Sequence, residues 1–261
     1  MKITKVCGTY FSPTGHTAQA VRAVMNGTGL EQSIIDLTRP ENREREYEFS
    51  AEELLVIGAP VYGGRIPSVS EGIFEHLHGQ GTPAIFLVTY GNRAYEDALL
   101  ELAEQCQARG FVPIAASAVV AQHSYSVRIA SGQPDQNALD ELKAFGKQVI
   151  DWAKTACLEE VSLSIPGNHP YRDFPGMPFA PEPDDTCVKC MACAKVCPVA
   201  AISSSDPTCV DAARCIDCYA CVMVCPKHSR EIRHPAFVGK PQKMEQAFGS
   251  PTKKNEFFTL F

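Results

Sequence analysis

Two runs of cysteines with identical spacing constrain this chain more than any other feature of its sequence. The first reads Cys-x-x-Cys-x-x-Cys-x-x-x-Cys-Pro over residues 187–198, and the second repeats it over residues 215–226. Each cysteine of the second run, and its proline, lies 28 residues after its counterpart in the first. An internal repeat of this kind indicates two copies of one structural unit.

The spacing suits iron–sulfur chemistry. Three thiolates on one short loop can bind three irons of a [4Fe–4S] cluster, and each run resembles the cluster-binding run of bacterial ferredoxins, whose fourth cysteine binds the other cluster. That rule implies two ligand sets: Cys187, Cys190, Cys193 and Cys225 for cluster one, and Cys215, Cys218, Cys221 and Cys197 for cluster two. A structural zinc site is the alternative, but zinc joins two Cys-x-x-Cys pairs into one tetrahedron and has no use for a third thiolate and a Cys-Pro in each run.

Length and composition set wider limits. The 261 residues allow one large domain or two modest ones, and a formal net charge of −6 gives no reason to expect nucleic acid. The N-terminal residues have no apolar signal core, and no apolar run approaches the roughly 20 residues needed to cross a bilayer. We therefore expect a soluble protein, with no membrane insertion, in the reducing cytoplasm. Of the four other cysteines, Cys7 and Cys106 are expected to be buried and inert, and Cys209 is left outside the ligand sets.

Residues 1–156 read as alternating strands and helices, the pattern of an α/β fold with a doubly wound parallel sheet. Buried strands are predicted at 3–11, 32–37, 53–59, 83–90 and 112–120, and helices at 15–26, 68–78, 94–109 and 135–156. In such a sheet a ligand binds at the carboxyl ends of the strands. Three loops at those ends carry the residue types that a cofactor needs.

The first loop follows the first strand and opens a helix. It contains Ser12, Thr14, Gly15, His16 and Thr17. Hydroxyl groups, a glycine that allows close backbone approach and a helix N-terminus suit a phosphate group. The loop has no lysine of the kind that nucleoside triphosphate loops require, and a plain helix cap is the simpler alternative.

The second and third loops follow the third and fourth strands. Glycines beside aromatic residues in these loops suit a flat ring. The candidates are Pro60, Val61, Tyr62, Gly63 and Gly64 in the second loop, and Thr89, Tyr90, Gly91, Asn92 and Tyr95 in the third. His123, after the fifth strand, borders the same region, and a cofactor contact or a structural histidine fits it equally well.

These three loops resemble those of the flavodoxin family, in which the first binds the FMN phosphate and the others bracket the isoalloxazine ring. Together with the cysteine runs, they resemble EFR1-type flavodoxin–ferredoxin fusion proteins over residues 1–235. The resemblance implies one FMN, two [4Fe–4S] clusters, a five-stranded sheet in the order 2-1-3-4-5 and a small α+β ferredoxin domain. Pro13 departs from the pattern because it lacks an N–H for the phosphate. The ring loops contain no tryptophan, so any aromatic residue that stacks on the ring must be Tyr62, Tyr90 or Tyr95.

The chain is therefore expected to contain an FMN-binding domain at 1–156, a proline-rich linker at 157–183, a ferredoxin domain at 184–235 and a phenylalanine-rich tail at 236–261. Exposure of so many aromatic side chains to water is unfavourable, so docking of the tail on the N-terminal domain is expected, with a partner-binding peptide as the alternative.

Every strong motif binds a redox cofactor, whereas no stretch identifies a substrate or a catalytic residue. The leading hypothesis is an electron-transfer iron–sulfur flavoprotein that passes low-potential electrons between its clusters and FMN and on to redox partner proteins. The alternative is an FMN-dependent oxidoreductase that reduces a small organic substrate with electrons from the clusters. A weaker reading is redox sensing through the tail. Donor, acceptor and oligomeric state stay open.

Overall fold

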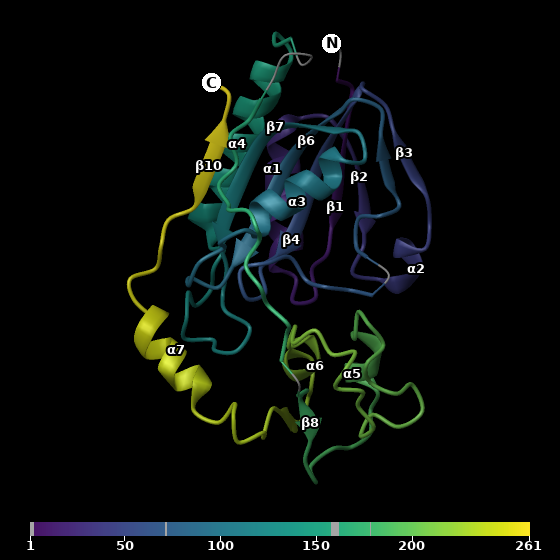
Figure 1. Ribbon diagram of the computed structural model, residues 1–261, viewed down its shortest axis with the longest axis vertical. Helices are drawn as coiled ribbons and strands as arrows, with labels where there is room; N and C mark the ends of the chain where they lie inside the picture. The colour runs from purple at the N-terminus through teal and green to yellow at the C-terminus, as the bar shows by residue number, and fades with distance from the viewer. Residues whose placement is uncertain (1–2, 71, 158–161, 178) are drawn as a thin grey trace.

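The computed structural model describes residues 3–70, 72–157, 162–177 and 179–261. Figure 1 shows a layered α/β domain and, beyond one end of its sheet, a segment with short helices that contains both cysteine runs. We call this part, residues 182–235, the cysteine-rich segment. The yellow C-terminal segment leaves the cysteine-rich segment and runs back along the α/β domain. The chain therefore crosses between the two parts twice.

The sheet of the α/β domain is parallel except at one edge. Its parallel strands are β1 (Lys5–Tyr10), β2 (Glu31–Asp36), β4 (Glu53–Pro60), β6 (Thr82–Tyr90) and β7 (Phe111–Val120). They lie in the order β2-β1-β4-β6-β7, which is the flavodoxin-like order 2-1-3-4-5 and confirms the predicted fold. A sixth strand that the sequence did not predict, β10 (Glu256–Thr259), pairs antiparallel with β7.

Helices cover both faces of this sheet, as Figure 1 shows. α1 (His16–Thr28) and α4 (Gln136–Ala153) pack on one face, and α3 (Ala98–Gln107) packs on the other. Every residue of the central strand β6 is buried, because both of its faces lie under helices or loops. The helices predicted at 15–26, 94–109 and 135–156 all form, and their ends differ from the prediction by a few residues. Cys7 and Cys106 are buried, as predicted.

The helix predicted at 68–78 is wrong. The described residues of this stretch form a loop that leads into β5 (Leu77–Gly79), a short strand that pairs with β3 (Tyr47–Phe49). Its apolar residues at helix-like spacing, among them Ile73 and Phe74, are buried against the sheet face by an irregular backbone. Gly72, at φ 73°, lies in a left-handed conformation that a continuous helix does not contain.

The charged stretch at 40–50 forms the short helix α2 (Pro40–Arg43) and then β3. Arg43 is buried and donates hydrogen bonds to the carbonyl oxygens of Leu37, at 2.8 Å, and Pro198, at 2.7 Å. Since Pro198 directly follows a cysteine of the first run, this side chain ties the α/β domain to the cysteine-rich segment.

The cysteine-rich segment repeats its backbone as well as its sequence. α5 (Ala192–Lys195) and α6 (Ala220–Met223) begin 28 residues apart, and a two-residue ladder joins β8 (Glu182–Pro183) to β9 (Arg230–Glu231). Three pairs of residues at the same separation have positive φ: Lys189 and Asp217, Met191 and Tyr219, Ala200 and His228. Such conformations are uncommon outside glycine, so their repetition indicates that both runs fold as the same loop.

The C-terminal segment begins with α7 (Lys240–Phe248) and ends beside α4. The Phe257 ring lies 4.8 Å from that of Phe145, and the Phe261 ring stacks 5.7 Å from that of Trp152. No helix in the described ranges is both long and apolar enough to cross a membrane.

Candidate cofactor sites

A cavity of about 560 Å³ lies at the carboxyl ends of the parallel strands. Four parts of the chain line it: the loops of the α/β domain, the linker at Phe174 and Met177, the cysteine-rich segment at 216–218, and α7. Its volume is within the range of small-molecule sites, and its position is where a doubly wound sheet binds a ligand.

The N-terminus of α1 lies at one end of this cavity. Thr14 and His16 line the cavity, and the Thr14 hydroxyl lies 3.2 Å from Nδ1 of His16. Gly15 takes φ 88° at the turn into the helix. No hydrogen bond between described backbone groups uses the N–H groups of Thr14, His16 or Thr17, so the helix start presents donors of the kind that bind phosphate.

The loops after β4 and β6 also line the cavity. Tyr62, Gly63 and Gly64 face Tyr90 and Gly91 around the same cavity. Gly91 is packed so closely that an added Cβ would lie 2.4 Å from the His123 ring, and a Cβ on Gly63 would meet the Phe174 ring at 2.2 Å. These glycines therefore let the loops approach the groups that line the cavity.

His123 contributes a polar group to a largely apolar wall. Its Nδ1 accepts a hydrogen bond from the backbone N–H of Tyr125 at 3.0 Å, so the neutral ring carries its proton on Nε2. Burial, together with the charge of Arg93, lowers the pKa of His123 to about 4. The ring is therefore neutral at pH 7 and has an N–H to donate.

Several predicted residues lie beside the cavity rather than in its lining. Ser12 and Thr17 brace the loop: Ser12 Oγ accepts from the Ala18 N–H at 3.0 Å, and the Thr17 hydroxyl lies 2.7 Å from that of Thr89. Tyr95 donates to Glu256 of the C-terminal segment at 2.9 Å.

Asn92 is buried and makes three hydrogen bonds to the backbone of the C-terminal segment. Its Nδ2 donates to the carbonyl oxygens of Phe248, at 2.7 Å, and Pro251, at 3.1 Å. Its Oδ1 accepts from the Lys253 N–H at 2.8 Å. The side chain is thus oriented toward this segment.

Sequence reasoning missed several lining residues, most of them remote in the chain from the predicted loops. Tyr125 joins an aromatic cluster with Tyr219, at 4.7 Å between ring centroids, and with Phe237, at 5.4 Å. The missed residues also include Arg93, Ala94, Phe174, Met177, Ile216, Asp217, Cys218, Lys240, Lys243, Met244, Ala247 and Phe248. Arg93, Ala94 and Tyr125 lie in loops that the sequence already placed at the site, whereas the other residues had no signal in the sequence.

Two small cavities in the cysteine-rich segment are each lined by four cysteines. The first contains Cys187, Cys190, Cys193 and Cys225, and the second contains Cys197, Cys215, Cys218 and Cys221. Each set takes three thiols from one run and one from the other. Cys209 is exposed and lines neither cavity.

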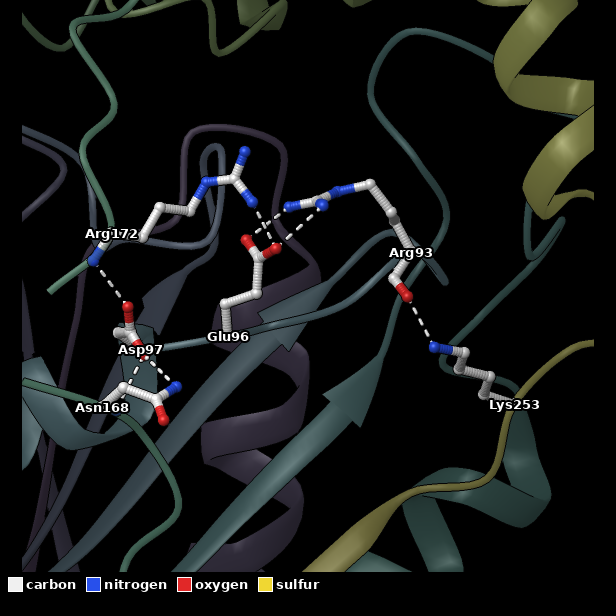
Figure 2. A network of polar contacts seen from close by, with 6 residues as sticks. All are labelled: Arg93, Glu96, Asp97, Asn168, Arg172 and Lys253. Atoms are coloured by element: carbon white, nitrogen blue, oxygen red, sulfur yellow. Dashed lines mark hydrogen bonds and ion pairs between the residues drawn. The ribbon is translucent and has the colours of Figure 1, made fainter.

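A polar network fixes the linker between the two parts (Figure 2). The Asp97 carboxylate accepts from the backbone N–H groups of Asn168, at 2.8 Å, and Arg172, at 2.6 Å, while Glu96 binds Arg172 and Arg93. Burial works against ionisation of Asp97, but these hydrogen bonds outweigh it and lower the pKa of its carboxyl. Arg93 also lines the cavity, so the network ends at its wall.

Comparison with known proteins directly supports iron–sulfur binding by the cysteine-rich segment. Residues 184–203 match a family model described as a 4Fe-4S binding domain. No curated protein sequence matches the chain significantly.

Among solved structures, an archaeal flavodoxin is 15% identical, with 58% of this chain and 99% of that chain covered and a TM-score of 0.42. A Streptococcus pneumoniae flavodoxin is 14% identical, with 58% and 100% covered and a TM-score of 0.40. A WrbA-like flavodoxin from Agrobacterium tumefaciens is 16% identical, with 58% and 98% covered and a TM-score of 0.37. At these scores the fold assignment rests on the strand order of the sheet. The chain combines a flavodoxin-like α/β fold with a 4Fe–4S binding segment.

Proposed function

We propose that this protein is an electron-transfer iron–sulfur flavoprotein that binds one FMN and two [4Fe–4S] clusters and exchanges electrons with redox partner proteins. Clusters carry single electrons, and FMN accepts one or two, so the two kinds of cofactor can connect one-electron and two-electron partners.

The arrangement of the cysteines supports two clusters. The two four-thiol cavities have the crossed composition that two-cluster ferredoxins require, with Cys197 in the set of the second run and Cys225 in that of the first. The backbone N–H of Ala201 donates to Cys197 Sγ at 3.2 Å, a contact of the kind that tunes such sites. In the proposed assignment cluster one is bound by the set with Cys225, and cluster two by the set with Cys197.

The lining of the cavity at the strand ends, called the large cavity below to distinguish it from the two cysteine cavities, supports FMN as its ligand. The donors at the α1 N-terminus would bind the phosphate, and the loops at Tyr62 and Tyr90 would hold the ring between them. His123 Nε2 would supply a hydrogen bond to a polar edge of the ring. Of the three tyrosines considered, Tyr62 and Tyr90 line the cavity and are the proposed stacking partners.

The proposal depends most on one observation, which is that the large cavity and the cavity of the second cysteine set share a wall. Ile216 and Cys218 line both the large cavity and the cavity of the second cysteine set. None of the cysteines proposed for cluster one lines the large cavity. Short separation is what electron transfer between cofactors needs, and this arrangement supports it between the proposed cluster two and the FMN ring.

Purification without oxygen, followed by assays of FMN, iron and acid-labile sulfide, tests the proposal. We expect one FMN and about eight irons per chain. In a stepwise reductive titration, cluster and flavin absorbance should both respond, and a Cys218→Ala variant should lose about half of its iron. Protein that contains zinc in place of iron after anaerobic reconstitution, or that binds no flavin, would contradict the proposal.

A second function, reduction of a small organic substrate at the flavin, is favoured by one observation. His123 places a neutral imidazole with an N–H on Nε2 in the wall of the cavity, where it could polarise a substrate oxygen by donating a hydrogen bond. Replacement of His123 by Gln should then slow the oxidation of the reduced protein by a substrate much more than its oxidation by a one-electron dye. Equal effects on both would remove this alternative.

A further inference from the structure

We propose that α7 is a wall of the flavin site, held in place by Asn92, and that FMN binding and the docking of α7 stabilise each other. This inference rests on the proposed FMN site and adds to it a segment far from every motif that predicted that site. It also identifies Asn92 as a positioning residue, which acts on the cofactor through the helix.

α7 turns one continuous face to the cavity. The lining residues Lys240, Lys243, Met244, Ala247 and Phe248 follow one another at intervals of three, one, three and one, which is the spacing of a single helix face. Three of them are apolar and two are cationic. An apolar face with flanking positive charge suits a flat aromatic ring that carries a phosphate and becomes more negative on reduction.

Outside this face, the residues of α7 do little to stabilise the helix. α7 has nine residues, none of them buried, and its first turn contains Pro241. Isolated helices of this length are marginal in water, so most of their stability must come from tertiary contacts. Docking of α7 therefore depends on contacts outside the helix, and a ligand in the cavity would add contacts along the face that α7 turns to it.

Specific contacts hold the helix at both ends and in the middle. Before the helix, Phe237 is buried in the aromatic cluster with Tyr125 and Tyr219. In the middle, Glu245 accepts a hydrogen bond from Ser126 Oγ at 2.5 Å. After the helix, Asn92 makes its three hydrogen bonds to the backbone of residues 248–253.

Asn92 connects this segment to the ring loop itself. It follows Gly91, which lines the cavity, and it takes a left-handed conformation at φ 61°. A change in this loop on ligand binding is therefore transmitted to α7 through the amide of Asn92. By thermodynamic linkage, a ligand that stabilises α7 is bound more tightly when α7 is held in place.

Hydrogen–deuterium exchange of the anaerobically prepared protein, with and without FMN, tests the coupling. We expect FMN to slow exchange of the amides of residues 240–248 about tenfold or more, in addition to those of the loops at 12–17 and 62–64. Protection of the loops without any change in α7 would overturn the inference.

Three variants separate positioning from direct contact. Asn92→Ala should speed exchange of α7 even without FMN and weaken FMN affinity about tenfold, which is within the usual range of coupling between sites. Phe248→Ala, which changes the helix face itself, should weaken FMN affinity in the same direction. Phe261→Ala, which loosens the far end of the segment at Trp152, is the matched control and should change neither quantity.

The outcomes distinguish this inference from the proposed function. If the unmodified protein fails to bind FMN, both fail. If it binds FMN and the Asn92→Ala and Phe248→Ala variants bind it equally well, only the role of α7 is wrong. If Asn92→Ala weakens FMN binding while α7 exchange stays unchanged, Asn92 contacts the cofactor directly and the positioning role is excluded.

Discussion

The α/β domain and the cysteine-rich segment are stabilised in different ways. The domain has two large apolar clusters, one on each face of a sheet whose central strand is completely buried. The clusters of the segment's own are small, although Val199 and Ala201 join one of the domain's clusters, and the segment contains six of the nine non-glycine residues with positive φ among those described. Conformations of this kind cost on the order of 1–3 kcal/mol each unless their surroundings enforce them.

This difference shows where the folding free energy of each part comes from. Burial is sufficient for the domain, because apolar area removed from water scales with the size of its core. In the segment, metal–thiolate bonds must offset the strained loops that burial cannot support. Loss of a cluster should therefore unfold the segment and leave the domain intact.

Replacement of Cys197 by Ala should have the largest effect. Although Cys197 belongs to the first run, it lines the cavity of the second set, so we expect iron to fall by about half and exchange protection to disappear around residues 215–221. Iron assays and hydrogen–deuterium exchange measure both. Cys209→Ala is the control, since Cys209 is exposed and outside both cavities. Full iron in the Cys197→Ala protein would show that the crossed ligand set is wrong.

Phe86→Ala should affect the other part. Phe86 is fully buried in the central strand, and its truncation should lower the free energy of unfolding of the domain by about 3–5 kcal/mol. Urea unfolding followed by the fluorescence of Trp152, the single tryptophan, reports on this domain. Val127→Ala, at a side chain that is 66% exposed, should change it by less than about 0.5 kcal/mol. A loss of iron in folded Phe86→Ala protein would mean that the two parts are not stabilised separately.

His123 lines the cavity between the two parts, and it should make the free energy of unfolding depend on pH. Its pKa is about 4 in the folded protein, below the ordinary value near 6.5, so the unfolded chain binds more protons between these values. The contribution of His123 to the free energy of unfolding is therefore fully present above pH 6.5. It should fall by about 2 kcal/mol between pH 6.5 and 5. His123→Gln should lack this part of the pH dependence. Identical slopes for both proteins in urea unfolding would contradict the assignment.

Asp97→Asn should have the smallest effect, confined to the connection between the parts. It weakens charge-assisted hydrogen bonds to Asn168 and Arg172, worth about 1–3 kcal/mol. We expect faster amide exchange at residues 168–172, with unchanged iron content and unchanged unfolding of the domain. Because the carboxyl pKa is lowered, this connection should weaken with acid only below the ordinary pKa near 3.8. A global loss of stability would show that the linker is part of the domain core.

Local patterns in the sequence predicted much of this structure. Strand and helix periodicity indicated the doubly wound sheet, and the two cysteine runs indicated repeated loops, because both signals lie within short windows. The segment at 68–78 failed because Ile73 and Phe74 are buried by an irregular loop, which periodicity cannot distinguish from a helix. Lining residues such as Phe174 and Met244 were missed because they reach the cavity only through tertiary contacts.

The antiparallel strand β10 has a consequence for synthesis on the ribosome. β7 emerges long before β10, and the whole cysteine-rich segment is translated between them. Until residues 256–259 arrive, β7 is the open edge of a hydrophobic sheet, the kind of surface on which chains associate wrongly. A nascent chain that pauses within the cysteine runs would expose this edge for longer, so the interval between the synthesis of β7 and that of β10 sets how long the sheet is open to wrong association.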